Sequence, residues 1–167
     1  LINLTDVDDK IIRRAQDQGK TITQVTEPVV QIFHEDRRYL RIEDAEVYPK
    51  ATEHIPEMIA LVERLLDRGI AYVAEDGSVY FAIDRFAGYG RLSRLDTREI
   101  KAGARVAQDD YTKENAQDFA LWKAVKPEDE ATGAVWDAPF GRGRPGWHLE
   151  CSAMAMKYLG ETLDIHC

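Results

Sequence analysis

The sequence predicts an α/β fold in which a middle region with a β-hairpin separates two α/β ends. Three observations predict this fold class. An apolar run at the start of the chain leads through an acidic loop into a helix, within residues 1–20. The apolar period changes to two around an Asp-Gly turn in residues 70–83. A loop rich in glycine and proline then leads into a helix and an apolar end, within residues 139–167. A domain inserted into a nucleotide-binding type of fold would have this organisation.

Composition limits the classes of protein to consider. The 167 residues are 44% hydrophobic and 31% charged, which suits a packed core and argues against wholesale disorder. The net charge of −8 argues against a broad positive surface for nucleic acid, although a local basic patch remains open. No apolar run reaches the roughly 18 residues of a membrane-spanning helix, and no signal-peptide pattern opens the chain. We therefore expect a cytoplasmic protein.

The two ends predict an internal piece of a longer polypeptide. The chain has no initiator methionine and opens on an apolar stretch, residues 1–4, that is typical of a strand already under way. It closes on residues 163–167 without a helix cap or a polar tail. Two cysteines, both near this end, are too few for a disulfide scaffold.

The first helices follow from caps and apolar spacing. The acids in residues 5–9 suit the start of a helix, because the free N–H groups and the dipole at a helix N-terminus favour negative charge. Gly19 suits the end of this helix. A second helix is predicted over residues 23–40. Its start could be as late as Thr26, because Pro28 is tolerated only in a first turn. The apolar residues of the third predicted helix follow helical spacing up to Gly69: Ile55, Met58, Ile59, Val62, Leu65 and Leu66.

The rest of the chain alternates short strands and loops. Strands are predicted at residues 70–74 and 78–83, which form a hairpin, and at residues 119–123, which are buried. The predicted loops are a charged loop at 108–117, an acidic mobile insertion at 126–133 and a glycine/proline-rich loop at 139–146. A helix is predicted at residues 147–159, with Gly160 after it, and a further strand at 163–166. The tryptophans Trp122 and Trp136 are interpreted as core or loop anchors.

The loop and helix start at residues 141–151 are the first candidate for chemistry. A glycine-rich loop before a helix can present backbone N–H groups to an anion or a nucleotide, and two arginines add positive charge there. Residues three and four apart share a helix face, so three side chains would point into one site: Trp147, His148 and Cys151. The alternative is a structural junction with a packed tryptophan and a buried cysteine.

Metal sites have only weak support in the residues alone. Zinc prefers cysteine and histidine ligands, but Cys151, Cys167 and the four histidines show no Cys-x-x-Cys or His-x-x-x-His spacing. The acids of residues 5–9 could bind Mg²⁺, or they could cap a helix and form salt bridges. Thr5, at the end of a predicted strand, is a better site candidate, since ligands bind there in open α/β sheets. His34 and His54 are interpreted as solvated surface positions.

Several motifs together resemble the cysteinyl-tRNA synthetases. The opening motif is residues 3–12, NLTDVDDKII, and the most specific is residues 143–154, GRPGWHLECSAM. Between and after them, in the order of the family, come residues 103–106 (GARV), 118–123 (DFALWK) and 163–167 (LDIHC). The resemblance covers essentially the whole chain. It implies a class I synthetase with a Rossmann-type catalytic domain interrupted by an α+β connective-peptide insertion. Residues 1–47 would end the first half, 48–127 would form the insertion, and 128–167 would start the second half.

The resemblance also implies a reaction and a site. Such enzymes activate cysteine with ATP and Mg to cysteinyl-adenylate, and then transfer the cysteinyl group to tRNA(Cys). They hold the substrate thiolate on zinc, and Cys151 matches one of the protein ligands. Zinc prefers thiolate to hydroxyl, so serine can be rejected without an editing site. Thr5 and Trp147 match the wall of the amino-acid pocket. His148 and His166 match positions near the substrate, where they would contact the carboxylate or the adenylate.

The remaining family motifs are missing from this sequence. The other zinc ligands, the HIGH-type ATP motif and the KMSKS-type loop would lie outside these residues, so we expect the isolated chain to be inactive. Two alternatives stay open: the related cysteine ligase of mycothiol synthesis, and a truncated paralogue that binds without catalysis. Lys10 after the acids fits the synthetase better than the mycothiol ligase.

Overall fold

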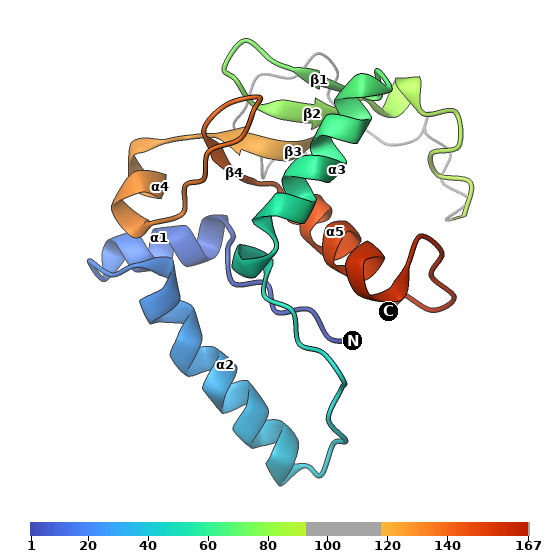
Figure 1. The fold of residues 1–167 in the computed structure, drawn as a ribbon. Helices are drawn as coiled ribbons and strands as arrows, with labels where there is room; N and C mark the ends of the chain where they lie inside the picture. The colour runs from blue at the N-terminus through green and yellow to red at the C-terminus, as the bar shows by residue number, and fades with distance from the viewer. Residues whose placement is uncertain (93–117, 167) are drawn as a thin grey trace.

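A four-stranded antiparallel sheet lies at the centre of the computed structural model, which describes residues 1–92 and 118–166 (Figure 1). Its strands pair in chain order: β1 (Ala71–Val73), β2 (Val79–Phe81), β3 (Phe119–Ala124) and β4 (Gly143–Pro145). The helices are α1 (Asp9–Asp17), α2 (Ile22–Tyr39), α3 (Ile55–Asp67), α4 (Pro127–Thr132) and α5 (Trp147–Leu159), with short 3₁₀ helices at Ala51–Glu53 and Ile83–Arg85. The predicted mixture of helices and strands is confirmed, and the described sheet is antiparallel. The one parallel pairing among the described residues is the bridge from Leu4 to Lys50.

One apolar core holds most of these elements together. Helices α3 and α5 pack against each other and onto the sheet, and α1 packs between α2 and α4 (Figure 1). Trp122 on β3 is fully buried in this core, as predicted. A smaller cluster, formed by Tyr72, Tyr80, Ala82 and Ala120, lies apart from this core. The core therefore joins the two ends of the chain to its middle.

Helices α1 and α3 form where the sequence predicts them. Asp8 caps α1 by accepting a 2.6 Å hydrogen bond from the backbone N–H of Ile11. Helix α3 is followed by Gly69 at a φ of 67°, a conformation that glycine adopts without steric cost. The hairpin is also confirmed, with Gly77 at a φ of 84° in its turn.

Helix α2 begins earlier than the proline suggested. Thr21 and Gln24 form a capping box, so the helix starts at Ile22, and a start at Thr26 is wrong. Pro28 therefore lies inside the helix, where it cannot donate to the carbonyl of Gln24. The predicted apolar face is only partly covered, because Val25 is buried while Val29, Ile32 and Leu40 are exposed.

The acidic stretch at residues 126–133 is a helix and not the mobile insertion that we expected. Pro127 supplies a fixed φ for the first turn, and the Lys126 N–H donates to the side chain of Asp129 at 2.9 Å. Gly133 ends the helix in the left-handed conformation. Asp129 is fully buried beside Arg144, so tertiary contacts order a segment whose composition alone suggests solvent exposure.

Three other expectations need correction. The predicted loop at residues 139–146 contains β4, because its backbone bonds to β3. Residues 1–4 are extended but form only the single bridge at Leu4, and residues 163–166 form no strand in the described part of the chain. An extended segment becomes a strand only where a neighbour completes its hydrogen bonds. The predicted loop at residues 108–117 lies outside the described residues.

The two histidines expected at the surface are both at least partly covered. His54 is 3% exposed, and its ring bonds to the Lys50 carbonyl at 2.7 Å and to the Tyr158 hydroxyl at 2.9 Å. His34 is half-buried, with its ring 4.9 Å from that of Tyr48. Both positions were misjudged because their neighbours in sequence are charged, whereas their covering residues come from elsewhere in the chain.

Candidate functional site

Two glycines fix the place where α5 begins. A Cβ at Gly143 would lie 2.1 Å from the Lys123 carbonyl oxygen, and one at Gly146 would lie 2.0 Å from the Ala120 carbonyl oxygen. Any side chain at either position would collide with the backbone of β3. Strand β4 therefore lies directly against β3, and the first turn of α5 starts from a fixed point.

This first turn presents the three side chains that the spacing predicts to share a face. Trp147 is 61% exposed and His148 is also exposed, while Cys151 is half-buried with a free thiol. The His148 ring lies 5.1 Å from that of Phe119 on β3 and 5.5 Å from the indole of Trp147. The first turn of α5 therefore presents the aromatic rings of Trp147 and His148, with the thiol of Cys151 one helical turn further along the helix.

The glycine-rich loop does not form an anion cradle, because its N–H groups bond within the protein. The N–H of Gly141 donates to the Ala138 carbonyl, that of Gly143 to Trp136, and that of Gly146 to Leu121, at 2.8 to 3.0 Å. Arg144 is buried and paired with carboxylates. The interpretation of these glycines as ligands for an anion is wrong; they serve close packing of strands.

The acids before α1 act as caps and ion-pair partners. Asp8 caps the helix, and Asp6 accepts hydrogen bonds from the N–H and hydroxyl of Thr52 at 2.9 and 2.6 Å. Asp9 pairs with Lys123 at 2.8 Å and with Arg144. Burial would raise the pKa of Asp9, but these two cations outweigh it and hold that pKa below its ordinary value. The structural interpretation of this acidic cluster is thus confirmed.

Metal ligands do not gather in the described part of the chain. Within residues 1–92 and 118–166, no three histidine, cysteine or acidic side chains are placed to hold a metal ion. A tetrahedral zinc site needs three or four protein ligands, so the described residues alone do not fit one. Cys151 is at most a single ligand of such a site, and Cys167 lies outside the described residues.

Glu150 is the residue of this region that sequence reasoning missed. It is 1% exposed, directly before Cys151, and its Oε2 has no hydrogen-bond partner. Burial raises the pKa of Glu150 to about 9, with the charges of Asp6 and Asp8 adding to the rise and Arg144 opposing it. The carboxyl is therefore protonated at neutral pH. This interaction also shows that the two sequence motifs, the acids before α1 and the first turn of α5, lie close together in space.

The other two predicted site residues lie on other segments of the chain. Thr5 borders a depression of about 230 Å³ between α1 and α2, whose lining is Thr5, Lys10, Ile11, Arg14, Val25, Thr26, Val29 and Val30. His166 lies in an exposed segment beyond the end of α5. The structure thus gathers Trp147, His148 and Cys151 on one turn, and the roles of all five residues stay predictions.

Comparison with known proteins decides the family. Residues 1–167 match the family described as the catalytic domain of tRNA synthetases class I (C). The chain belongs to this family. The antiparallel sheet and its covering helices are therefore part of a class I synthetase catalytic domain.

Several relatives of this class I synthetase chain are named Cysteine--tRNA ligase. The relative from Protochlamydia amoebophila is 53% identical over 169 residues, which cover 99% of the chain and 35% of the relative. The relatives from Methanococcus maripaludis (strain C7) and Chlamydia pneumoniae are 49% and 48% identical, with 99% of the chain and 34% and 35% of each relative covered. The chain thus spans about a third of the length of these relatives. Of the helices in the described residues, none has the length and apolar character needed to cross a membrane.

Proposed function

We propose that this chain is part of a cysteine–tRNA ligase, which uses ATP with Mg to convert cysteine into cysteinyl-adenylate and transfers it to tRNA(Cys). The observation that carries the proposal is a near-complete match, at 48 to 53% identity, to proteins named for that activity. Their names favour this activity over the mycothiol-pathway ligase and over a non-catalytic paralogue. The chain spans about a third of their length, so the activity belongs to a longer protein of which these residues are a portion.

The exposed first turn of α5 supports the proposed amino-acid pocket. Cysteine is small, and the exposed indole of Trp147 offers a flat apolar wall one helical turn from the thiol of Cys151. In the proposal Thr5 contributes to the same pocket, and His148 and His166 contact the carboxylate or the adenylate. Cys151 is one ligand of a zinc ion whose other ligands lie outside this chain. Zinc bound there would supply selectivity for thiolate over hydroxyl.

The domain division also stays a proposal. Residues 1–47 and 128–167 are assigned to the two halves of a Rossmann-type domain, and residues 48–127 to a connective-peptide insertion. The hairpin of β1 and β2 falls within the proposed insertion, which supports this division. The sheet nevertheless runs on from β3 into β4, so the proposed boundary at residues 127 and 128 does not separate two packing units.

The test uses the full-length protein that carries these residues. We expect cysteine-dependent exchange of pyrophosphate into ATP, with serine at least about a hundredfold poorer as a substrate. Cys151→Ser is expected to lower zinc content and exchange together. The matched control is Ser152→Ala, an exposed neighbour on the same helix. A wild-type protein without cysteine-dependent exchange would refute the function. Normal zinc content and exchange in Cys151→Ser would refute the ligand assignment alone.

A further inference from the structure

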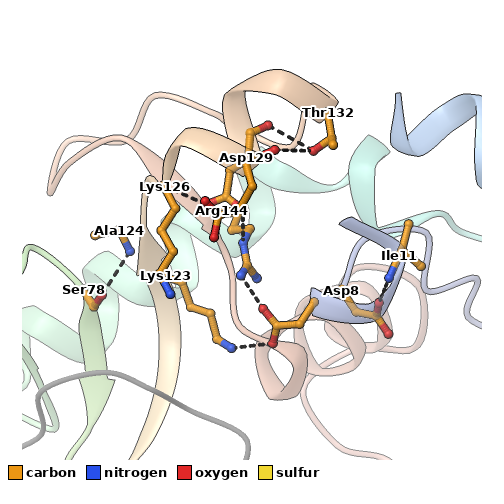
Figure 2. Close-up of polar contacts among 11 residues, drawn as sticks. Asp8, Ile11, Ser78, Lys123, Ala124, Lys126, Asp129, Thr132 and Arg144 are labelled. Carbon is orange, nitrogen blue, oxygen red and sulfur yellow. Dashed lines mark hydrogen bonds and ion pairs between the residues drawn. The ribbon is translucent and has the colours of Figure 1, made fainter. Parts of the chain in front are cut away.

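Four charged side chains from four different elements are joined by ion pairs, and Figure 2 labels three of them, Lys123, Asp129 and Arg144. We call them the ion quartet: Asp9 of α1, Lys123 of β3, Asp129 of α4 and Arg144 of β4. The Lys123 ammonium lies 2.8 Å from Oδ2 of Asp9, and Nη2 of Arg144 pairs with Oδ1 of the same carboxylate. Nε of Arg144 lies 2.9 Å from Oδ1 of Asp129. Arg144 therefore joins the two carboxylates with one rigid guanidinium.

Most of the quartet is buried, so each of its charges needs a closely placed partner of opposite charge. Asp129 is fully buried, and the side chains of Lys123 and Arg144 are 6% and 5% exposed, whereas that of Asp9 is 46% exposed. Each member of the quartet is paired with an opposite charge within it. Removal of one partner from a buried pair leaves an uncompensated charge, while the intact pair adds little net stability. Stability alone therefore explains such a quartet poorly.

The place of the quartet in the fold points to another role. Asp9 follows Thr5 through the capped start of α1, and Arg144 precedes Trp147 through Gly146. Both connections are short and fixed, the first by the Asp8 cap and the second by the close packing of Gly146 on β3. The contact from Asp9 to Arg144 thus links the segment of Thr5 to the turn of Trp147, in addition to the contacts that Leu4 and Asp6 make with residues 50–52.

We propose that Arg144, held by Asp9 and Asp129, is a positioning residue for the amino-acid pocket. It fixes the distance between the two proposed walls, Thr5 on one side and the turn with Trp147 and Cys151 on the other. This inference rests on the proposed function, because the pocket itself is part of that proposal. Arg144 is too deeply buried to contact the substrate, so it acts through the elements it joins.

The experiment measures steady-state pyrophosphate exchange by the full-length protein at a temperature well below its unfolding midpoint. Arg144→Lys keeps the charge but cannot reach both carboxylates, and Asp9→Asn removes the charge of the most exposed member of the quartet. We expect each variant to raise KM for cysteine about tenfold or more, because small displacements of positioning groups are costly. KM for ATP should change less than about twofold in both. Loss of folded enzyme would lower kcat and leave both KM values unchanged.

A matched control and a double variant complete the design. Arg142→Ala removes an exposed arginine of the same loop, which pairs with Glu130 and Asp137, and should leave both KM values unchanged. The variant with both Asp9→Asn and Arg144→Lys should have the same KM for cysteine as the worse single variant, because both substitutions disrupt the same contact between Asp9 and Arg144.

The inference fails if the wild type is active and both single variants keep the wild-type KM for cysteine. It also fails if neither variant folds, because the quartet would then have a role in stability only. A wild type without cysteine-dependent exchange overturns the proposed function and, with it, this inference.

Discussion

Glu150 shows at the residue scale how far tertiary environment can change an acid. In the sequence it is an ordinary glutamate in an apolar helical run, with no signal beyond its neighbours Leu149 and Cys151. In the structure it is enclosed, with one oxygen unpartnered, and burial foremost raises its pKa to about 9. An enclosed carboxyl of this kind costs folding free energy at every pH at which the unfolded chain would ionise it.

Glu150→Gln is therefore expected to stabilise the protein. The folded protein keeps this proton up to about pH 9, whereas the unfolded chain releases it near pH 4.5. The folded state thus binds more protons between these values, and its stability falls as pH rises through them. Glutamine has the same shape without the charge, so we expect a gain of up to about 3 kcal/mol at pH 7. Thermal unfolding of the full-length protein at pH 4.5 and pH 8 checks this. A difference between the two proteins that does not grow with pH would contradict it.

Single residues were predictable where local spacing decides their position. The shared face of Trp147, His148 and Cys151 follows from helix geometry alone, and the structure confirms that they lie on one turn. The burial of His54 and Glu150 could not be predicted, because residues distant in sequence cover them. Charge in the local sequence indicates exposure only when no other element packs there.

At the scale of elements, β4 was the hardest to predict and has the strictest packing. Its three residues, Gly143–Pro145, have the composition of a loop, and its backbone pairs with β3 and, at Gly143, with Trp136. Helix α3, by contrast, was predicted correctly because its apolar period runs over several turns. Helix α4 was missed because buried contacts of Asp129, rather than periodicity, hold it in place.

Gly146→Ala is expected to displace β4 from β3. The new Cβ would lie 2.0 Å from a backbone carbonyl, so the strand must move, at a cost of about 1–3 kcal/mol or more. Gly88→Ala is a matched control, because its Cβ would make only an ordinary 3.5 Å contact with the Phe86 ring. Urea unfolding of the two full-length variants compares them. Equal midpoints would show that β4 has more room than the packing indicates.

At the scale of the whole molecule, the ion quartet ties α1 to the sheet and to α4 (Figure 2). The sequence predicted salt bridges for the acids before α1 but not their partners, because Lys123 and Arg144 lie more than a hundred residues further along the chain. Contacts of such long range depend on the packed core that brings the ends together, and local patterns carry no information about them.

Acid should weaken this link between the ends of the chain. The pKa of Asp9 is lowered in the folded protein, so its contribution to stability is present above its ordinary pKa of 3.8 and is lost as pH falls through the lower folded value. We therefore expect Asp9→Asn to be less stable than wild type at pH 6, with the difference shrinking as the pH falls below 3.8. Chemical unfolding of both full-length proteins across this range checks the sign. A difference that persists unchanged in acid would show that the Asp9 charge is not its source.

The close fit of Gly143 and Gly146 against β3 has a consequence for the speed and strength of ligand capture. If the proposed pocket lies here, a backbone turn anchored this tightly would have its shape before any ligand arrived. The apparent affinity would then not be reduced by the need to populate a rare conformer of this turn. Encounter, rather than rearrangement of this turn, would then govern how fast a small ligand settles against Trp147.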